Sequence, residues 1–125
     1  MISVIYVRSP AGGSVDEIEA QIEQCRDYAR RLGSKSIEVY SDIGATGWTL
    51  DRPGLQAALN RIEDGDVDYF IFSHLSCLSH RVRDQLLLIK TLEDMGVAVV
   101  SVRTPIPHPL SLICLQEKYL CDRPN

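Results

Sequence analysis

The sequence predicts an α/β fold with three layers: a mostly parallel sheet of about four to five strands, with helices on both faces and flavodoxin-like winding. Short apolar, β-branched runs alternate with amphipathic helical stretches. A glycine ends each helical stretch, and the connections to the next strand are short. Strands that alternate with helices in this way require crossover connections between parallel neighbours. With 125 residues, 45% of them hydrophobic, the chain is large enough for one core.

The first elements follow from local signals. Residues 2–7 are apolar and β-branched and predict a buried strand. Ser14 predicts a helix N-cap, and Glu17 completes a capping box. Gly33 predicts the end of this helix. The buried face is expected to hold Ile18, Ile22, Cys25, Ala29 and Leu32. Residues 37–40 predict the second strand.

The second half repeats the pattern. Pro53 suits the first position of a helix that ends at Gly65. Its buried stripe is expected to be Leu55, Ala58, Leu59 and Ile62. Residues 68–72 and 97–102 predict the third and fourth strands, and residues 79–95 predict the helix between them. On that helix we expect Val82, Leu86, Ile89 and Leu92 to face inward.

Residues 1–102 are therefore predicted to form one α/β domain. Residues 103–125 are predicted to be a proline-rich turn and a short C-terminal helix over 110–120, not a separate domain. No helix-turn-helix fits into that remainder, so sequence-specific DNA recognition by this chain alone is not expected.

Composition and charge argue against several classes of protein. No apolar run approaches the ~20 residues needed to cross a bilayer, and no signal-peptide pattern opens the chain, so no membrane association is expected and a cytoplasmic protein is predicted. The net charge of −4 argues against a broad basic surface for duplex DNA but permits a focused phosphate site. The four cysteines show no C-x-x-C spacing and are expected to be free thiols.

Three chemically distinctive stretches follow strand ends. Arg8 and Ser9 end the first strand, and Arg52 follows the second strand within Asp-Arg-Pro-Gly-Leu. Residues 74–80 follow the third strand. Because the carboxyl ends of parallel strands meet at one edge of a sheet, these stretches should form one site. Guanidinium groups match phosphate oxygens, so the site is predicted to be suited to phosphate.

In order and spacing these motifs, together with Glu19-Ala20-Gln21 and Gly65-Asp66-Val67-Asp68, resemble the serine recombinases over about residues 4–102. The resemblance is to the catalytic domain of the resolvase and invertase group. It implies a resolvase-like fold and site-specific recombination of mobile-element DNA, in which a serine attacks a phosphodiester without a metal ion or cofactor. It also implies assembly with further copies or with a recombinase partner.

The resemblance assigns roles to individual residues. Arg8 and Arg52 match two arginines of the family's catalytic site, and Gln21 matches a glutamine of the first helix. The nucleophile position is Pro10. The family's Asp-Arg-Leu-Ser-Arg falls on residues 76–80, where Ser76, Cys77 and His80 replace the aspartate and both arginines.

These replacements predict a degenerate member. Losing one preorganised donor lowers a rate by ~10²–10³, and two donors and the nucleophile are replaced here. We therefore expect a catalytically inactive domain with a regulatory or protein-interaction role and, by itself, weak DNA binding.

Two alternatives place chemistry on the remaining residues. In the first, Ser9 is a displaced nucleophile that acts with Arg8 and Arg52, and a partner supplies DNA binding. Adjacent strand residues point to opposite faces, so we favour Ser9 as a structural serine at a strand end. In the second, Arg8 and Arg52 bind phosphate or another anion in a non-catalytic α/β module.

A zinc site is a further alternative. His74, Cys77 and His80 have metal-ligand side chains, and Cys114 or Cys121 would supply a fourth ligand. Three ligands across a strand-to-helix turn seldom converge, so we predict no metal and no cofactor.

Overall fold

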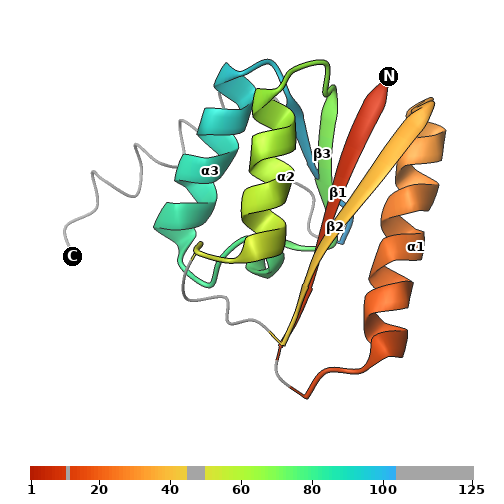
Figure 1. Ribbon diagram of the computed structural model, residues 1–125, viewed down its shortest axis with the longest axis vertical. Coiled ribbons are helices and arrows are strands. Elements are labelled where there is room, and N and C mark those ends of the chain that lie inside the picture. Colours follow the sequence, from red (N-terminus) through yellow and green to blue (C-terminus); the bar gives the residue numbers. More distant parts are fainter. Residues whose placement is uncertain (11, 45–49, 104–125) are drawn as a thin grey trace.

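The computed structural model describes residues 1–10, 12–44 and 50–103. Its sheet contains four parallel strands in the order β2-β1-β3-β4 (Figure 1). The strands are β1 (Ile2–Ser9), β2 (Ser36–Ile43), β3 (Tyr69–Phe72) and β4 (Ala98–Ser101). This order is that of a flavodoxin-like doubly wound sheet, which confirms the predicted fold class.

Helices cover both faces of the sheet. Helix α1 (Val15–Arg31) lies on one face, and α2 (Pro53–Glu63) and α3 (Val82–Asp94) lie together on the other (Figure 1). A one-turn 3₁₀ helix, η1 (Leu75–Cys77), connects β3 to α3. Alternate residues of β1 enter the two cores: Val4 and Tyr6 pack with α2 and α3, while Ile5 and Val7 pack with α1.

The cap at Ser14 and the end of α1 before Gly33 are confirmed. The Ser14 Oγ accepts a hydrogen bond of 3.1 Å from the Glu17 amide, and Gly33 adopts a φ of 84° beyond the helix. Of the predicted buried face, Ile18, Cys25 and Ala29 are buried, and Ile22 and Leu32 are partly buried.

The third helix begins later than predicted. Residues 79–81 form a turn in which the Ser79 Oγ accepts a hydrogen bond of 3.0 Å from the Arg81 amide, and α3 starts at Val82. The expected inward position of Val82 is wrong, because this side chain is 55% exposed at the start of the helix. Leu88 is buried together with Ile89 and Leu92, and Leu86 is partly buried.

The second strand is longer than predicted. Every residue of β2 from Ser36 to Ile43 pairs with β1, so the sheet extends the strand through polar positions that carry no hydrophobic signal. The predicted helix over 110–120 lies outside the described residues. No helix in the described part of the chain is both long and apolar enough to cross a membrane.

Candidate functional site

Two buried arginines meet one short turn at the carboxyl edge of the sheet. Arg8 lies near the end of β1 and is 7% exposed, and Arg52 immediately precedes α2 and is 2% exposed. Both guanidinium groups donate to main-chain oxygens of the η1 turn. The predicted convergence of these strand ends therefore places both arginines beside residues 76–78.

Arg52 makes the larger set of contacts. Its Nη1 donates to the Tyr6 hydroxyl at 3.0 Å and to the Cys77 carbonyl at 2.8 Å, and its Nη2 donates to the Leu78 carbonyl. The guanidinium carbon also lies 5.6 Å from the centre of the Tyr6 ring. The side chain thus links β1 to the end of the η1 turn.

Arg8 binds the preceding carbonyl of the same turn. Its Nη2 donates to the Ser76 oxygen at 2.8 Å. Three consecutive carbonyls, those of Ser76, Cys77 and Leu78, therefore accept hydrogen bonds from two guanidinium groups. Bonds from a charged donor are stronger than neutral ones, so the arginines fix the path of this turn.

Asp42 completes the network from β2. One carboxylate oxygen accepts from the Gly54 amide at 2.8 Å, and the other accepts from the Leu55 amide at 2.9 Å and from the Tyr6 hydroxyl at 2.7 Å. A carboxylate suits these first amides of α2, which have no partner within the helix. Burial, followed by the hydrogen bond to Asp42, raises the pKa of Tyr6.

Ser9 lies apart from this network. It is fully buried, and its Oγ donates a long hydrogen bond of 3.5 Å to the Pro10 carbonyl. A methyl group at Gly13 would lie 3.1 Å from the same Oγ, so the Gly13 backbone covers the hydroxyl. By strand alternation Ser9 shares the face of Ile5 and Val7, whereas Arg8 shares the face of Tyr6.

Gln21, Cys77 and His74 form a neighbouring polar cluster. Gln21, 1% exposed, donates to the Arg8 carbonyl at 3.4 Å and accepts from the Cys77 thiol at 3.7 Å. The Cys77 Sγ lies 3.2 Å from the His74 Nδ1. Burial raises the pKa of Cys77, whereas burial and the charges of Arg103 and Arg8 lower the pKa of His74. A thiol thus occupies a position where the resemblance implies an arginine.

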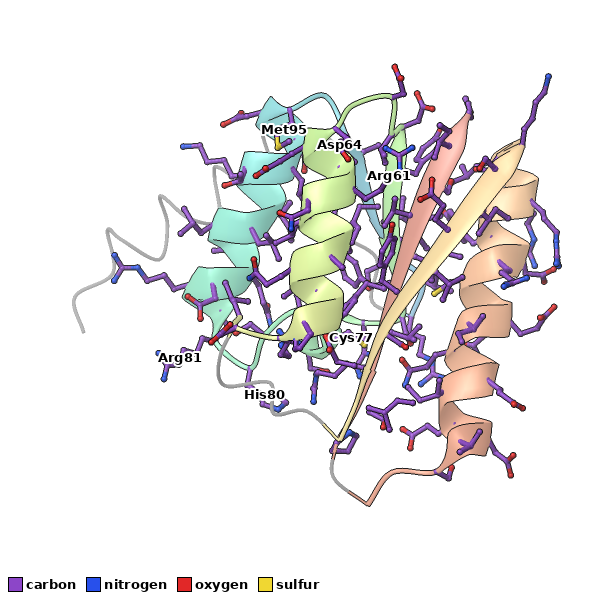
Figure 2. The ribbon with its side chains drawn as sticks, in the orientation of Figure 1. Arg61, Asp64, Cys77, His80, Arg81 and Met95 are labelled. Carbon is purple, nitrogen blue, oxygen red and sulfur yellow. The ribbon has the colours of Figure 1, made fainter. Side chains whose placement is uncertain are left out.

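The remaining residues of the motif lie in different environments. Ser76 is half-buried, while His80 and Pro10 are exposed. Figure 2 shows Cys77 near the first turn of α2 and His80 extending toward the outside. Within residues 1–10, 12–44 and 50–103, no group of three or more side chains of the metal-ligand types comes together. Cys114 and Cys121 lie outside the described residues.

Comparison with known proteins decides the family. Residues 3–112 match the model of the family described as "Resolvase, N terminal domain". The chain belongs to this family. The resolvase domain is also similar to solved structures of serine recombinase catalytic domains, whereas no curated protein matches it in sequence.

Three of the structures illustrate the similarity. The N-terminal catalytic domain of TP901-1 integrase is 28% identical, covers 98% of both chains and has a TM-score of 0.81. The C-terminal catalytic domain of ISC1926 TnpA, an IS607-like serine recombinase, is 24% identical over 97% of this chain and 80% of that one, with a TM-score of 0.75. A resolvase family site-specific recombinase from Streptococcus pneumoniae is 18% identical over 98% of this chain and 89% of that one, with a TM-score of 0.69. The last two likenesses support the fold alone.

Two residues of the network, Tyr6 and Asp42, were not predicted from the sequence of the resolvase domain. In the parallel register of β1 and β2, Arg8 is the partner of Asp42. Tyr6 lies two residues earlier on β1 and, because side chains alternate, on the same face of the sheet as Arg8. The helix start at Pro53 is the signal that could have identified Asp42, because the first amides of a helix need an acceptor from outside the helix. Asp42 is the carboxylate at the end of the preceding strand and accepts from two of these amides.

Proposed function

We propose that this resolvase domain takes part in site-specific DNA recombination without cutting DNA, and that it acts through contacts with recombinase partners or further copies of itself. Membership of the family supports the recombination role. The observation that carries the rest is the bonding of Arg8 and Arg52 to the carbonyls of residues 76–78.

Phosphoryl transfer requires positive donors that already face the phosphate. Here a phosphate would have to compete with main-chain oxygens for the two guanidinium groups. Each buried carbonyl that lost its donor would cost about 1–3 kcal/mol. The arginines are therefore suited to holding the turn rather than to stabilising a charged transition state.

The lack of an accessible nucleophile beside Arg8 also supports a domain that does not cut DNA. Pro10, at the family's nucleophile position, has no hydroxyl. Strand exchange by Ser9 would require the covered Oγ to become exposed and to approach Arg8 from the opposite face of β1. Cys77 and His80 occupy the positions at which the family pattern has arginines, so two guanidinium groups of that pattern are replaced.

The retained fold is suited to a regulatory role. A domain of this shape can join an assembly of recombinase domains and alter its activity without contributing a nucleophile. The net charge of −4 supports weak DNA binding by the chain alone, so DNA contacts would come mainly from the partner.

A covalent-trapping assay tests this proposal. The purified chain and its Ser9→Ala and Pro10→Ser variants are incubated with a labelled pool of random-sequence duplex DNA, and labelled protein is sought after denaturation. An active serine recombinase with its own site serves as the positive control. We expect no adduct from the native chain, because Pro10 has no hydroxyl and the Ser9 Oγ is covered by the Gly13 backbone.

The variants separate the two reasons for inactivity. Pro10→Ser is also expected to form no adduct, because Cys77 and His80 do not supply the two guanidinium groups of the family pattern. An adduct with Pro10→Ser alone would show that the arginines remain competent. An adduct with the native chain that disappears in Ser9→Ala would contradict the proposal and favour strand exchange by Ser9.

A further inference from the structure

Helix α3 carries one row of exposed side chains on the side that faces away from the core. It lies beside α2, on the opposite face of the sheet from α1 (Figure 1). Its core side is formed by its three buried residues: Leu88, Ile89 and Leu92. The other side carries four exposed residues, spaced four, three and four apart: Arg83, Leu87, Lys90 and Asp94. Because an α-helix turns once every ~3.6 residues, this spacing keeps the four side chains in one row, with the 61% exposed Leu87 near its middle.

The charges at the two ends of this row are the reverse of those that stabilise a single helix. Acidic residues are favoured at a helix N-terminus and basic residues at a C-terminus, because of the helix dipole. Helix α1 follows this rule, with two acidic residues in its first turn and two arginines in its last turn. In α3, by contrast, Arg81 is the N-cap and Arg83 follows beside Asp84, while the last turn has no basic residue and ends at Asp94. Arg83 and Asp94 therefore gain little from their own helix.

Neighbouring side chains do not neutralise these two charges either. Within the described part of the chain, the ion pairs join residues of α1 to one another and Arg61 to Glu38, and none includes Arg83 or Asp94. Lys90 lies four residues before Asp94, but a base that precedes an acid is the less favourable order for a pair within a helix. Both ends of the row can therefore pair with charges of another molecule.

The row is complementary to itself when two copies meet in antiparallel orientation. In a two-fold pair, Arg83 of one copy faces Asp94 of the other, since the two residues are equally distant from the middle of the row, and the same contact forms again at the other end. The two Leu87 side chains then cover each other near the two-fold axis, and the stem of Lys90 extends past them to water. Each positive helix start also lies beside a negative helix end. The arrangement that is unfavourable in one helix is thus favourable in the pair.

We propose that this row is a docking surface for a second copy of the same chain, in which two α3 helices pair antiparallel around Leu87 with Arg83–Asp94 ion pairs at both ends. The inference rests on the part of the proposed function that assigns contacts with further copies, and it does not depend on whether the domain cuts DNA. With 13 residues, α3 is about 20 Å long and ~10 Å wide. A contact of this size is smaller than the standard ~800 Å² per partner, so the dimer should dissociate readily on dilution.

Exchange of the charges in the full chain tests this pairing. Sedimentation velocity over a range of concentrations measures the dimer dissociation constant of the native chain, Arg83→Glu, Asp94→Arg and the double variant. Each single substitution puts like charges opposite each other at both ends, so we expect this constant to rise about tenfold or more. The double variant restores opposite charges and should return it to within about threefold of the native value. The matched control is Glu63→Arg, at an exposed position of α2, which should change it by less than about twofold.

Urea denaturation of the monomer separates pairing from damage to the domain. Both single substitutions improve the match between the end charges and the helix dipole, so the urea midpoint should stay constant or rise while the dimer weakens. Leu87→Asp gives an independent test, because it places a charge at the centre of the pair and the native side chain is 61% exposed in the monomer. It should abolish the dimer and leave the midpoint unchanged.

Other results would overturn the proposal. A native chain that stays monomeric up to about 1 mM would show that α3 does not bind a second copy. A dimer that is unaffected by the single substitutions and by Leu87→Asp would show that another surface is used. A double variant as weak as the single ones would contradict the contact between Arg83 and Asp94. None of these results concerns DNA cutting, which the covalent-trapping assay tests separately.

Discussion

Arg52 has the largest side chain among the fully buried residues of the described part of the chain. A buried charge is tolerated only when hydrogen bonds replace its lost water. For Arg52 these come from the Tyr6 hydroxyl and two carbonyls of the η1 region. In the folded chain, Arg52 therefore connects β1, α2 and η1.

Replacement of Arg52 should strongly destabilise the domain. We expect Arg52→Ala to lower the free energy of unfolding by about 3 kcal/mol or more, because buried acceptors left without donors cost ~1–3 kcal/mol each. Arg52→Lys should recover little of this loss, since one ammonium group cannot reproduce the forked contacts. Urea denaturation measures both.

Arg61→Ala is the matched control. Its ion pair with Glu38, at 3.0 Å, is partly exposed, and such pairs contribute about 0–1 kcal/mol. If Arg52→Ala were no more destabilising than Arg61→Ala, the structural role of Arg52 would be wrong.

At the scale of elements, the start of α2 depends on close contact with β2. Asp42 accepts hydrogen bonds from the Gly54 and Leu55 amides, and a methyl group at Gly54 would lie only 2.2 Å from the Ser41 carbonyl oxygen. The Asp-Arg-Pro-Gly motif therefore has a steric reason for its glycine as well as a helix-start proline.

Gly54→Ala should consequently destabilise the domain even though alanine favours helices. We expect the free energy of unfolding to fall by about 1–3 kcal/mol, as in other overpacked sites. Asn60→Ala, at an exposed position of the same helix, should change it by less than about 0.5 kcal/mol. Chemical denaturation compares the two, and equal stabilities would contradict the close contact.

The elements differ in how well the sequence predicts them. The limits of α1 follow from Ser14 and Gly33, because a cap and a left-handed turn leave local signals. The start of α3 does not, since residues 79–81 were predicted as helix but form a turn before it. Ser41 and Asp42 of β2 also have no strand signal of their own, and their extended form comes from pairing with β1.

For the whole molecule, the buried titratable groups link folding to pH. Burial raises the pKa of Cys25 to about 12 from an ordinary value of 9.0 and also raises those of Cys77 and Tyr6. All three groups are neutral when protonated, so the folded state holds these protons more tightly than the unfolded state.

The free energy of unfolding should therefore fall at high pH. These groups contribute their full stabilisation below about pH 9, and they lose it as the pH rises toward 12. We expect the urea midpoint to fall over this range and to fall less steeply in Cys25→Ala, which lacks one of the thiols. A midpoint that stays constant or rises with pH would contradict these buried thiols.

The sequence by itself determined the order of strands and helices, the parallel sheet and the family, because periodicity, caps and motif spacing are properties of neighbouring residues. It also indicated that Arg8, Arg52 and the residues after β3 would meet at one edge of the sheet. Only the tertiary structure decided what the arginines bind there. Their hydrogen bonds to residues 76–78 and the cover over Ser9 depend on segments far apart in the chain, whose distances no local pattern records.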